Sequence, residues 1–331
     1  MMILSIIIPI YNGSATIATT LDSIWAQGLL VDEFEVICVD DRSTDDTYTY
    51  LQGLASQHTN MRVLRNPENL RAGGARNYGV REARGEYVVF IDADDYFHSG
   101  ALRKVVEYQA EHRLDILMCD NVRHSAGEDS EKLIHNIENR SVMSGVDFMV
   151  KSGLPWAPWK YIFRRSLMVD NGVWFVEKVS CEDVDWTHKL AYFAEKMQYQ
   201  PILLTHFILN DTSQTATEFK NANVIWHRFY SARRVYDLID TTYKHHPESH
   251  SYLRGVASAQ YFVGVLYLNS FILKPSVKRD MIVKYIPRNE SFHKLVSFAA
   301  DNPMIYALLS NLASPLFRLA VVLKRKIKKR R

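Results

Sequence analysis

The stretch over residues 87–95 constrains the fold of this 331-residue chain more than any other, because a strongly apolar run ends in a cluster of acids. The run YVVFI is bulky and partly β-branched, which is typical of a strand covered on both faces in a parallel sheet. Three carboxylates, Asp92, Asp94 and Asp95, follow it within four positions. Ligands of open α/β sheets bind outside the carboxyl ends of the strands, so we expect these acids at a binding edge.

Two interpretations of this acidic cluster are open. Acids that leave an extended strand can direct two carboxylates at one hard cation, which would in turn hold a diphosphate. Alternatively, an Asp is a common N-cap, and a helical pattern follows Ser99. Capping needs one acid, whereas three unpaired carboxylates repel one another. The cluster therefore favours a metal site.

Buried strands alternate with amphipathic helices up to about residue 210, which predicts βαβ units, an α/β fold and a mostly parallel sheet flanked by helices. We expect strands over 3–10, 34–39, 61–64, 86–91, 115–119, 161–163 and 198–209, and helices over 71–83, 102–112 and 182–197. Ser14 and Ser43 are expected to cap two further helices. The polar stretch 125–140 is either a surface excursion or a short hairpin.

The chain is predicted to have three parts. Residues 1–218 form the α/β domain, with a first half over 1–120 and a second half over 121–218. Residues 219–301 form a helical extension whose joins carry Pro247 and Pro275. The apolar run 261–273 has 13 residues, short of the roughly 20 that span a bilayer, so we expect a buried helix there. Residues 302–331 form a basic amphipathic tail.

Charge is distributed unevenly along the chain. The net charge is +3, but residues 324–331 hold seven basic residues and no acid, so the rest of the chain is mildly acidic. The charge therefore gives no reason to expect a nucleic-acid-binding body. Leucines recur at helical spacing before the basic run, and this favours a tail lying on an anionic membrane surface. A disordered tail and a spanning helix are the alternatives, the latter disfavoured by Pro315 and Arg318.

The cysteines indicate a reducing compartment. Cys38, Cys119 and Cys181 are far apart in sequence, without a Cys-x-x-Cys spacing. The apolar stretch 2–10 lacks a basic leader and a small-residue cleavage site, so it reads as a strand rather than a signal peptide. Together with the tail, these features predict a cytoplasmic protein that is peripheral on the inner face of the cell membrane.

Six segments in sequence resemble the inverting family 2 glycosyltransferases of bacterial surface-polysaccharide type, whose fold is the Rossmann-like GT-A fold. They are SIIIPIYN from residue 5, VDDRSTD from residue 39, RAGGARN from residue 71, IDADD from residue 91, the Trp159-Lys160 pair and the Glu182-Asp183 pair. The resemblance covers residues 3 to about 210. It implies transfer of a sugar from a nucleotide-diphosphate donor, such as a UDP-sugar, to an acceptor hydroxyl with the help of Mg²⁺ or Mn²⁺.

The resemblance also assigns roles on the donor side. It implies that Asp94 binds the metal directly and that Asp92 contacts the ribose or reaches the metal through water, while the part of Asp95 in the metal site is less defined. The remaining residues are assigned to the nucleotide pocket: Tyr11 against the base, Asp40 as acceptor for an imide N–H with Asp41 beside it, Arg71 near the base or diphosphate, and Pro9 and Asn12 as pocket walls. For Asp40 and Asp41, turn and cap chemistry is the alternative.

On the acceptor side, the resemblance makes Asp183 the general base. The start of a helix stabilises a carboxylate and lowers its pKa, so Asp183 either acts as a base with much help from proximity or only caps its helix. Glu182 orients Asp183 or contacts the acceptor. Trp156 and Trp159 either stack on a sugar or belong to the core. For Arg76 and Asn77, a structural role in the helix and a role in the site are equally compatible with the sequence.

These observations predict a metal-dependent glycosyltransferase that acts on a glycan or lipid-linked acceptor in surface-polysaccharide synthesis. One rival is a sugar-nucleotide nucleotidyltransferase, which would need a basic triphosphate-binding loop near the N-terminus, and 9–13 is not such a loop. A second rival is a non-catalytic protein that binds nucleotide-sugars or serves as a scaffold at the membrane. The presence of both Asp94 and Asp183 argues against it.

Overall fold

A computed structural model describes residues 2–125, 132–133, 140–209 and 222–270 of the chain. These residues divide into two compact units, one formed by residues 1–216 and 242–252 and the other by residues 217–241 and 253–331. The predicted boundary at residue 218 and the predicted tail over 302–331 lie outside the described residues. Among the helices of the described part, none is long and apolar enough to cross a membrane.

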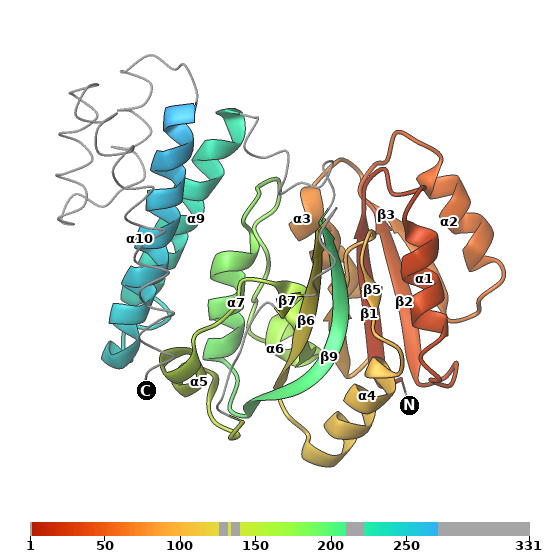
Figure 1. Cartoon of the computed structure of the whole chain (residues 1–331), viewed down its shortest axis with the longest axis horizontal. Helices are drawn as coiled ribbons and strands as arrows, with labels where there is room; N and C mark the ends of the chain where they lie inside the picture. The colour runs from red at the N-terminus through yellow and green to blue at the C-terminus, as the bar shows by residue number, and fades with distance from the viewer. Residues whose placement is uncertain (1, 126–131, 134–139, 210–221, 271–331) are drawn as a thin grey trace. The chain divides into compact units, whose positions relative to one another are not determined.

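The first unit is built on a mixed sheet that is mostly parallel. Its strands are β1 (Leu4–Ile10), β2 (Phe34–Asp40), β3 (Met61–Arg65), β4 (Tyr87–Phe90), β5 (Tyr96–Phe97), β6 (Ile116–Ser125), β7 (Lys132–Leu133), β8 (Tyr161–Arg164) and β9 (Met197–Leu209). They are ordered β3-β2-β1-β4-β8-β6-β9-β5, and β7 pairs with β6. The α/β class and the parallel start of the sheet are therefore confirmed (Figure 1).

Parallel pairing joins β3, β2, β1 and β4, and it returns between β6 and β9. The inserted strand β8 runs antiparallel to both β4 and β6, so β4 and β6 point the same way. The carboxyl ends of β1, β2, β4 and β6 consequently lie at one edge of the sheet. Every residue of β1, β2 and β4 is buried, as expected for strands covered on both faces.

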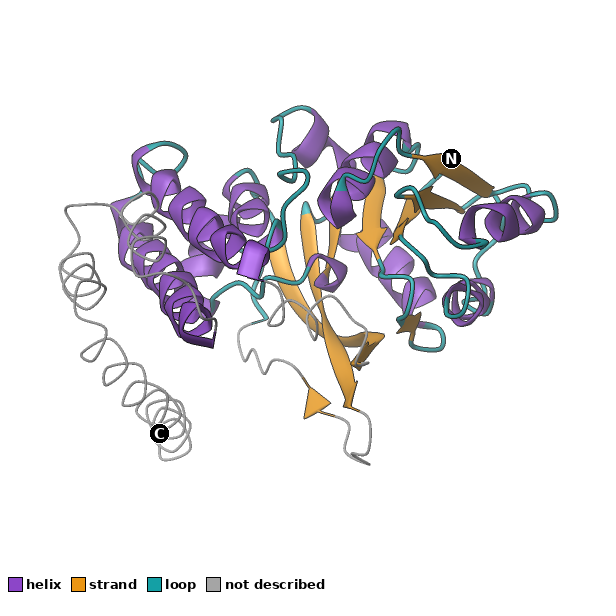
Figure 2. Cartoon of the chain, turned by 90° about the horizontal axis from the view of Figure 1, so that it is seen from above, coloured by secondary structure: helices purple, strands orange, loops and turns teal. Residues whose placement is uncertain are grey.

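Helices cover both faces of the sheet, and Figure 2 shows them on either side of the strands. They are α1 (Ile17–Trp25), α2 (Thr47–Ala55), α3 (Arg71–Glu82), α4 (Ala101–His112), α5 (Gly145–Ser152), α6 (Arg165–Val169) and α7 (Asp183–Tyr192), with a 3-10 turn η1 (Pro158–Lys160). One face of β1 packs with α1 and α4 in a single apolar cluster. On the other face, a Cβ on Gly79 of α3 would lie 2.4 Å from the Ile7 side chain, so the glycine allows helix and strand to approach closely.

The structure corrects several local predictions. Ser14 and Ser43 do not cap helices: α1 begins at Ile17 and α2 at Thr47, and both serine hydroxyls bond across neighbouring loops instead. Helix α7 ends at Tyr192 rather than at residue 197, and Met197 is instead the first residue of β9. The hairpin alternative for 125–140 is supported, since β6 and β7 pair antiparallel.

The second unit contains α9 (Ala222–Asp240) and most of α10 (Pro247–Ser270), whose first residues belong to the first unit. Pro247 is the first residue of α10, a position where its missing N–H costs nothing. Within this unit Phe229, Ala232 and Val235 of α9 and Ala257 of α10 are buried. A helical extension after the sheet is therefore present in the described residues.

Candidate active site

The carboxyl edge of the sheet gathers the loops that follow β1, β2 and β4. The register pairs Ile10 of β1 with Asp40 of β2, so the loops that begin after these residues are neighbours. Non-glycine residues with a left-handed backbone concentrate here, which is typical of functional loops. Five of the six such residues in the described chain follow β1 and β2, begin α3 or lie in the loop before α7: Asn12, Arg42, Arg71, Lys178 and Cys181.

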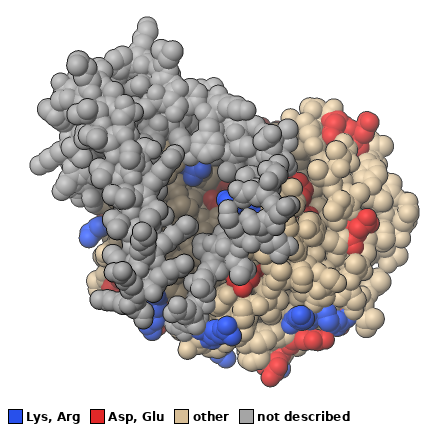
Figure 3. Space-filling view, in the orientation of Figure 1, with Lys and Arg blue, Asp and Glu red and all other residues tan. Residues whose placement is uncertain are grey.

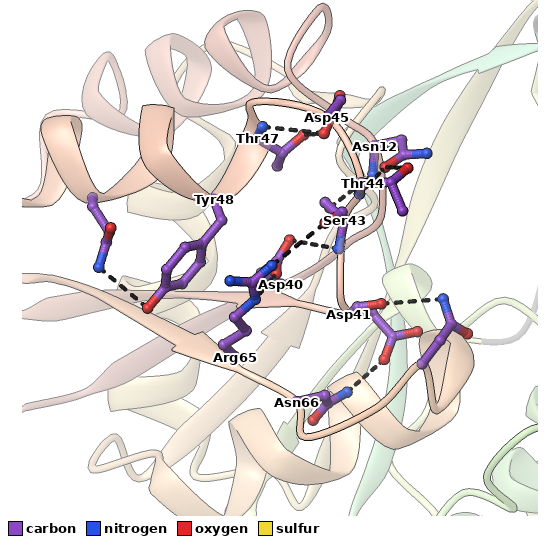
Figure 4. A network of polar contacts seen from close by, with 12 residues as sticks. Asn12, Asp40, Asp41, Ser43, Thr44, Asp45, Thr47, Tyr48, Arg65 and Asn66 are labelled. Atoms are coloured by element: carbon purple, nitrogen blue, oxygen red, sulfur yellow. Dashed lines mark hydrogen bonds and ion pairs between the residues drawn. The ribbon is translucent and has the colours of Figure 1, made fainter.

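Asn12 ties the β1 loop to the β2 loop. With φ at 52°, its backbone N–H donates to the Ser43 hydroxyl at 2.9 Å, and its side-chain oxygen accepts from the Thr44 N–H at 2.8 Å (Figure 4). The neighbouring Tyr11 is 52% exposed. Pro9 lies deeper, buried in β1 opposite Val39.

Asp40 is fully buried, and its carboxylate is paired with an arginine of the same sheet. Its carboxylate lies 2.9 Å from the Arg65 Nε and accepts from the Ser43 N–H at 3.2 Å. The Arg65 guanidinium also packs over the Tyr48 ring at 4.2 Å (Figure 4). The partly exposed polar group at this point of the edge is therefore Arg65, with a side chain 35% exposed. Arg65 was not predicted from the sequence as a site residue.

Asp41 organises the segment that leads into α3. Its Oδ1 accepts from the Asn66 side chain at 2.7 Å and from the Leu70 N–H at 2.8 Å, and its carbonyl oxygen accepts from Asn69 at 3.1 Å (Figure 4). Burial raises the pKa of this carboxyl group, although the hydrogen bonds oppose the shift. These contacts are the turn chemistry that the sequence left as an alternative. Arg71, at the start of α3, donates to the Ser180 hydroxyl at 3.0 Å.

The three acids after β4 occupy different environments. Asp95 is 1% exposed and accepts the Ile208 N–H at 2.9 Å, which ties the acidic segment to β9. Burial, and next the charge of Asp92, raise the pKa of Asp95 to about 9. Asp92 and Asp94 are only partly buried. The structure thus places Asp95 as an internal anchor and leaves the other two acids accessible at the edge.

The donor set fits a divalent cation that is shared with a substrate. Within the described ranges, no group of three or more His, Cys, Asp or Glu side chains is arranged to hold a metal by itself. Mg²⁺ and similar hard cations are commonly bound by one or two carboxylates, with phosphate and water supplying the other oxygens. Asp92 and Asp94, both partly buried, are the carboxylates that would supply the protein share of such a site.

Arg76 joins the loop that follows β4 to the residues that begin α7. Its guanidinium donates to Asp92 Oδ1 at 2.8 Å and to Glu182 Oε1 at 2.8 Å, and the residue is 3% exposed. Glu182 is 7% exposed, and Asp183 follows it as the first residue of α7. Asp183 is near enough for its charge to raise the pKa of Arg76. The signal for Arg76 in the sequence was its place in RAGGARN, which alone did not separate a structural from a site residue.

The tryptophan loop lies against the second half of the sheet. Trp159 stacks on Phe207 of β9, with ring centroids 5.7 Å apart and planes 7° apart. Both Trp156 and Trp159 are partly exposed, and neither indole N–H has a hydrogen-bond partner among the described residues. Trp159 therefore packs on the sheet, as the core interpretation expects, while its stacking on a sugar stays a prediction.

Surface charge near this edge is mixed. In the face shown in Figure 3, the acidic and basic side chains of the described residues are interspersed rather than segregated.

Comparison with known proteins gives a family from the sequence and a matching fold from the structure. Residues 5–175 match the model of "Glycosyl transferase family 2". The uncharacterized glycosyltransferase YibD of Escherichia coli is 28% identical over 69% of this chain and 67% of its own length. The poly(ribitol-phosphate) beta-glucosyltransferase of Bacillus spizizenii is 32% identical over 59% of this chain, but the match spans only 30% of that enzyme. The S. aureus TarS 1–349 structure with UDP-GlcNAc superposes with a TM-score of 0.58 at 19% identity, covering 86% of this chain and 82% of TarS 1–349.

Proposed function

Because the chain belongs to glycosyl transferase family 2, we propose that it transfers a sugar from a UDP-sugar to a hydroxyl of a glycan or lipid-linked acceptor, with Mn²⁺ or Mg²⁺ as cofactor. One observation carries the proposal. Asp92, which follows β4, and Glu182, which precedes α7, both form ion pairs with one buried arginine, Arg76, and Asp94 and Asp183 lie close to them in sequence. This arrangement supports placing donor-side and acceptor-side acids in one site.

Each acid has a distinct task in a single displacement. A divalent metal held by Asp94 and Asp92 would act as a Lewis acid for the negative charge that develops on the leaving diphosphate. Asp183 accepts the proton of the attacking hydroxyl. The N-terminus of α7 stabilises the Asp183 carboxylate, which weakens it as a base, so the rate depends on holding the acceptor close.

Nucleotide binding is assigned to the loops after β1 and β2. Tyr11 is exposed beside Asn12 and offers a ring face to the base. Arg65 supplies donors at the position where Asp40 is already paired, and Arg71 lies at the start of α3. The partly exposed Trp156 and Trp159 are assigned to the acceptor sugar.

Two substitutions test the proposal by separating donor binding from chemistry. Asp94→Ala is expected to abolish Mn²⁺-dependent binding of UDP, measured by calorimetry, with an unchanged circular dichroism spectrum. Asp183→Asn is expected to keep UDP affinity and to lose turnover of a UDP-sugar by roughly two to four orders of magnitude, the range of a general base. A panel of UDP-sugars screened for Mn²⁺-dependent thermal stabilisation selects the donor. Undiminished UDP affinity in Asp94→Ala would refute the metal assignment.

We extend the proposal to the place of action. The seven basic residues in 324–331 and the leucine spacing before them support attachment to the anionic inner face of the cell membrane, where a lipid-linked acceptor would be available. A role in surface-polysaccharide synthesis is supported by the similarity to the poly(ribitol-phosphate) beta-glucosyltransferase of Bacillus spizizenii.

A further inference from the structure

Helix α3 holds the loop that precedes the acceptor-side acids. The Asn77 side chain donates to the Phe175 carbonyl at 2.9 Å and accepts from the Phe175 N–H at 2.9 Å. One turn earlier, a Cβ on Gly73 would lie 2.9 Å from the Val176 carbonyl oxygen and 3.0 Å from the Glu182 Cγ. The loop therefore packs directly on the helix backbone, and its position is set by α3.

Arg76 lies between these two contacts and reaches in both directions. Its two terminal nitrogens each form one ion pair of 2.8 Å, with Asp92 and with Glu182. The side chains of the three residues are 4%, 27% and 9% exposed, respectively. The guanidinium carbon also lies 5.8 Å from the Phe90 ring centre and 5.6 Å from that of Phe175. The group is thus fixed by aromatic rings as well as by its two carboxylate partners.

The charges around Arg76 explain why a cation is retained in this buried place. Burial opposes its charged form, but Asp92, Glu182 and then Asp183 raise the pKa of the guanidinium. A planar guanidinium can bind two carboxylates in fixed directions, whereas an ammonium group acts as a point charge. Removing the cation would leave the buried Glu182 carboxylate and the partly buried Asp92 carboxylate without this counterion, which is costly.

We propose that Arg76 is a positioning residue that sets the distance between the donor and the general base. The inference rests on the proposed function, because it assigns Asp92 to the donor side and Asp183 to the acceptor side. Asp92 leaves β4, whereas Glu182 and Asp183 belong to the loop and helix that follow in the second half of the domain. The backbone around Arg76 connects these elements through α3, and the guanidinium joins them directly.

The expected consequence is catalytic rather than a matter of donor affinity. A displacement of about 1 Å between reacting groups can cost roughly 100-fold in rate. Arg76→Lys keeps the charge but cannot hold both carboxylates in fixed directions. We expect kcat for the selected UDP-sugar to fall roughly 100-fold, while the Kd of UDP with Mn²⁺ changes by less than about threefold.

Arg81→Lys is the matched control. Arg81 lies on the same helix, is exposed, and packs over the Trp174 ring at 4.7 Å without contact to the acids. We expect this variant to retain wild-type kcat and UDP affinity. Glu182→Gln removes one arm of the bridge from the other side, so it tests the same coupling if Arg76→Lys does not fold.

The pH profile separates positioning from a purely structural role. Arg76 and Tyr161 are groups whose electrostatic interaction with Asp183 the structure identifies, and Glu182 and Asp185 adjoin it in sequence. Arg76→Gln removes the positive charge that favours the Asp183 carboxylate, so the acid limb of kcat/KM is expected to move to higher pH. Arg76→Lys keeps the charge, and its acid limb is expected to stay in place despite the lower kcat.

The outcomes distinguish this inference from the proposed function. If wild-type protein shows no Mn²⁺-dependent UDP binding and no turnover, the proposed function fails. If wild-type protein is active and Arg76→Lys matches Arg81→Lys in kcat, the positioning role of Arg76 is wrong. An equal loss of UDP affinity and kcat in Arg76→Lys would also overturn it, because the residue would then act on donor binding.

Discussion

The buried environment of Lys160 lowers the stability of the folded state. The residue is fully buried at the end of η1, and its amine has no hydrogen-bond partner among the described residues. Burial lowers the pKa of Lys160 to about 8, and the charge of Asp120 only partly offsets the effect. Asp120 in turn accepts from the Tyr199 hydroxyl through both carboxylate oxygens. The buried amine therefore destabilises the folded state whenever it is charged.

A pH-dependent stability follows from this shift. Below about pH 8 the amine is charged in both the folded and the unfolded state, so the full cost of burial is present. Above pH 8 the folded state releases the proton while the unfolded state, with the ordinary pKa of 10.5, keeps it. The free energy of unfolding of wild type relative to Lys160→Met is expected to rise by about 2 kcal/mol from about pH 7 to about pH 9.5.

Urea unfolding of both proteins at the two pH values measures this difference. Lys104→Met, at an exposed position of α4, is the control for loss of one amine. If the difference in the free energy of unfolding between wild type and Lys160→Met does not change with pH, the Lys160 amine is solvated or paired.

The residue scale also marks the limit of sequence reasoning about the site. The acidic run after β4 was identified because an apolar strand ending in acids has few explanations. The sequence did not predict which of the three acids is buried, because Asp95 accepts a hydrogen bond from Ile208 of β9, which is distant in sequence. Likewise, Asp40 was expected to accept a hydrogen bond from the nucleobase. Its ion pair with Arg65 could not be predicted without the register that places Asp40 of β2 opposite Arg65 of β3.

At the scale of elements, strands were easier to predict than helix ends. Continuous apolar runs identify buried strands such as β1 and β4 without knowledge of their neighbours. The helix caps failed because the serine side chains have tertiary partners: Ser14 donates to Asp45 at 2.8 Å, and Ser43 accepts from Asn12. Loop-to-loop contacts at the site thus replaced local capping. The antiparallel insertion of β8 between β4 and β6 also depends on long-range pairing that no local pattern encodes.

The two glycines Gly73 and Gly53 allow the role of α3 to be tested at this scale. A Cβ on Gly73 would crowd the Val176 carbonyl, the Phe175 Cβ at 3.1 Å and the Glu182 Cγ. Gly73→Ala is therefore expected to displace the loop before α7, lowering turnover by at least about tenfold and stability by roughly 1–3 kcal/mol. Thermal unfolding and UDP-sugar turnover are the measurements.

Gly53→Ala is the matched control, in the exposed middle of α2. A Cβ there has no neighbour within 4 Å, so the exchange only removes the flexibility of glycine. It is expected to raise stability by about 0.5–1 kcal/mol without changing turnover. If Gly73→Ala behaves like Gly53→Ala, the close approach of α3 to the loop is not required for activity.

At the scale of the whole molecule, the first unit is discontinuous in sequence. Residues 242–252 belong to it, although α9 lies between them and β9. Tyr243 is fully buried in this unit, and its hydroxyl donates to the His188 carbonyl of α7 at 2.6 Å. The Tyr252 hydroxyl accepts from the Leu154 N–H at 2.8 Å. The helix that carries Asp183 is therefore packed by a segment that follows α9.

Truncation can separate this packing role from the role of the chain beyond α10. A protein that ends at Ser270 retains Tyr243 and Tyr252 and should keep the melting temperature of the full chain and its Mn²⁺-dependent UDP binding. It lacks the basic run over 324–331, so it is expected to lose flotation with anionic vesicles, which the full chain should show at low salt and lose at high salt.

A protein that ends at residue 218 is the decisive comparison, because it corresponds to the shortest catalytic domain that the sequence suggests. It lacks Tyr243, so the His188 carbonyl loses the hydrogen bond from the Tyr243 hydroxyl. Helix α7 also loses the contact of Tyr192 with the Tyr243 ring, whose centre is 5.0 Å away. Loss of a buried hydrogen bond and of a large buried ring is expected to cost roughly 3–5 kcal/mol or more. We therefore expect this shorter protein to melt well below the one ending at Ser270 and to lose turnover. Equal melting temperatures would mean that residues 242–252 do not support the catalytic unit, and vesicle binding retained by the protein ending at Ser270 would exclude the tail as the membrane contact.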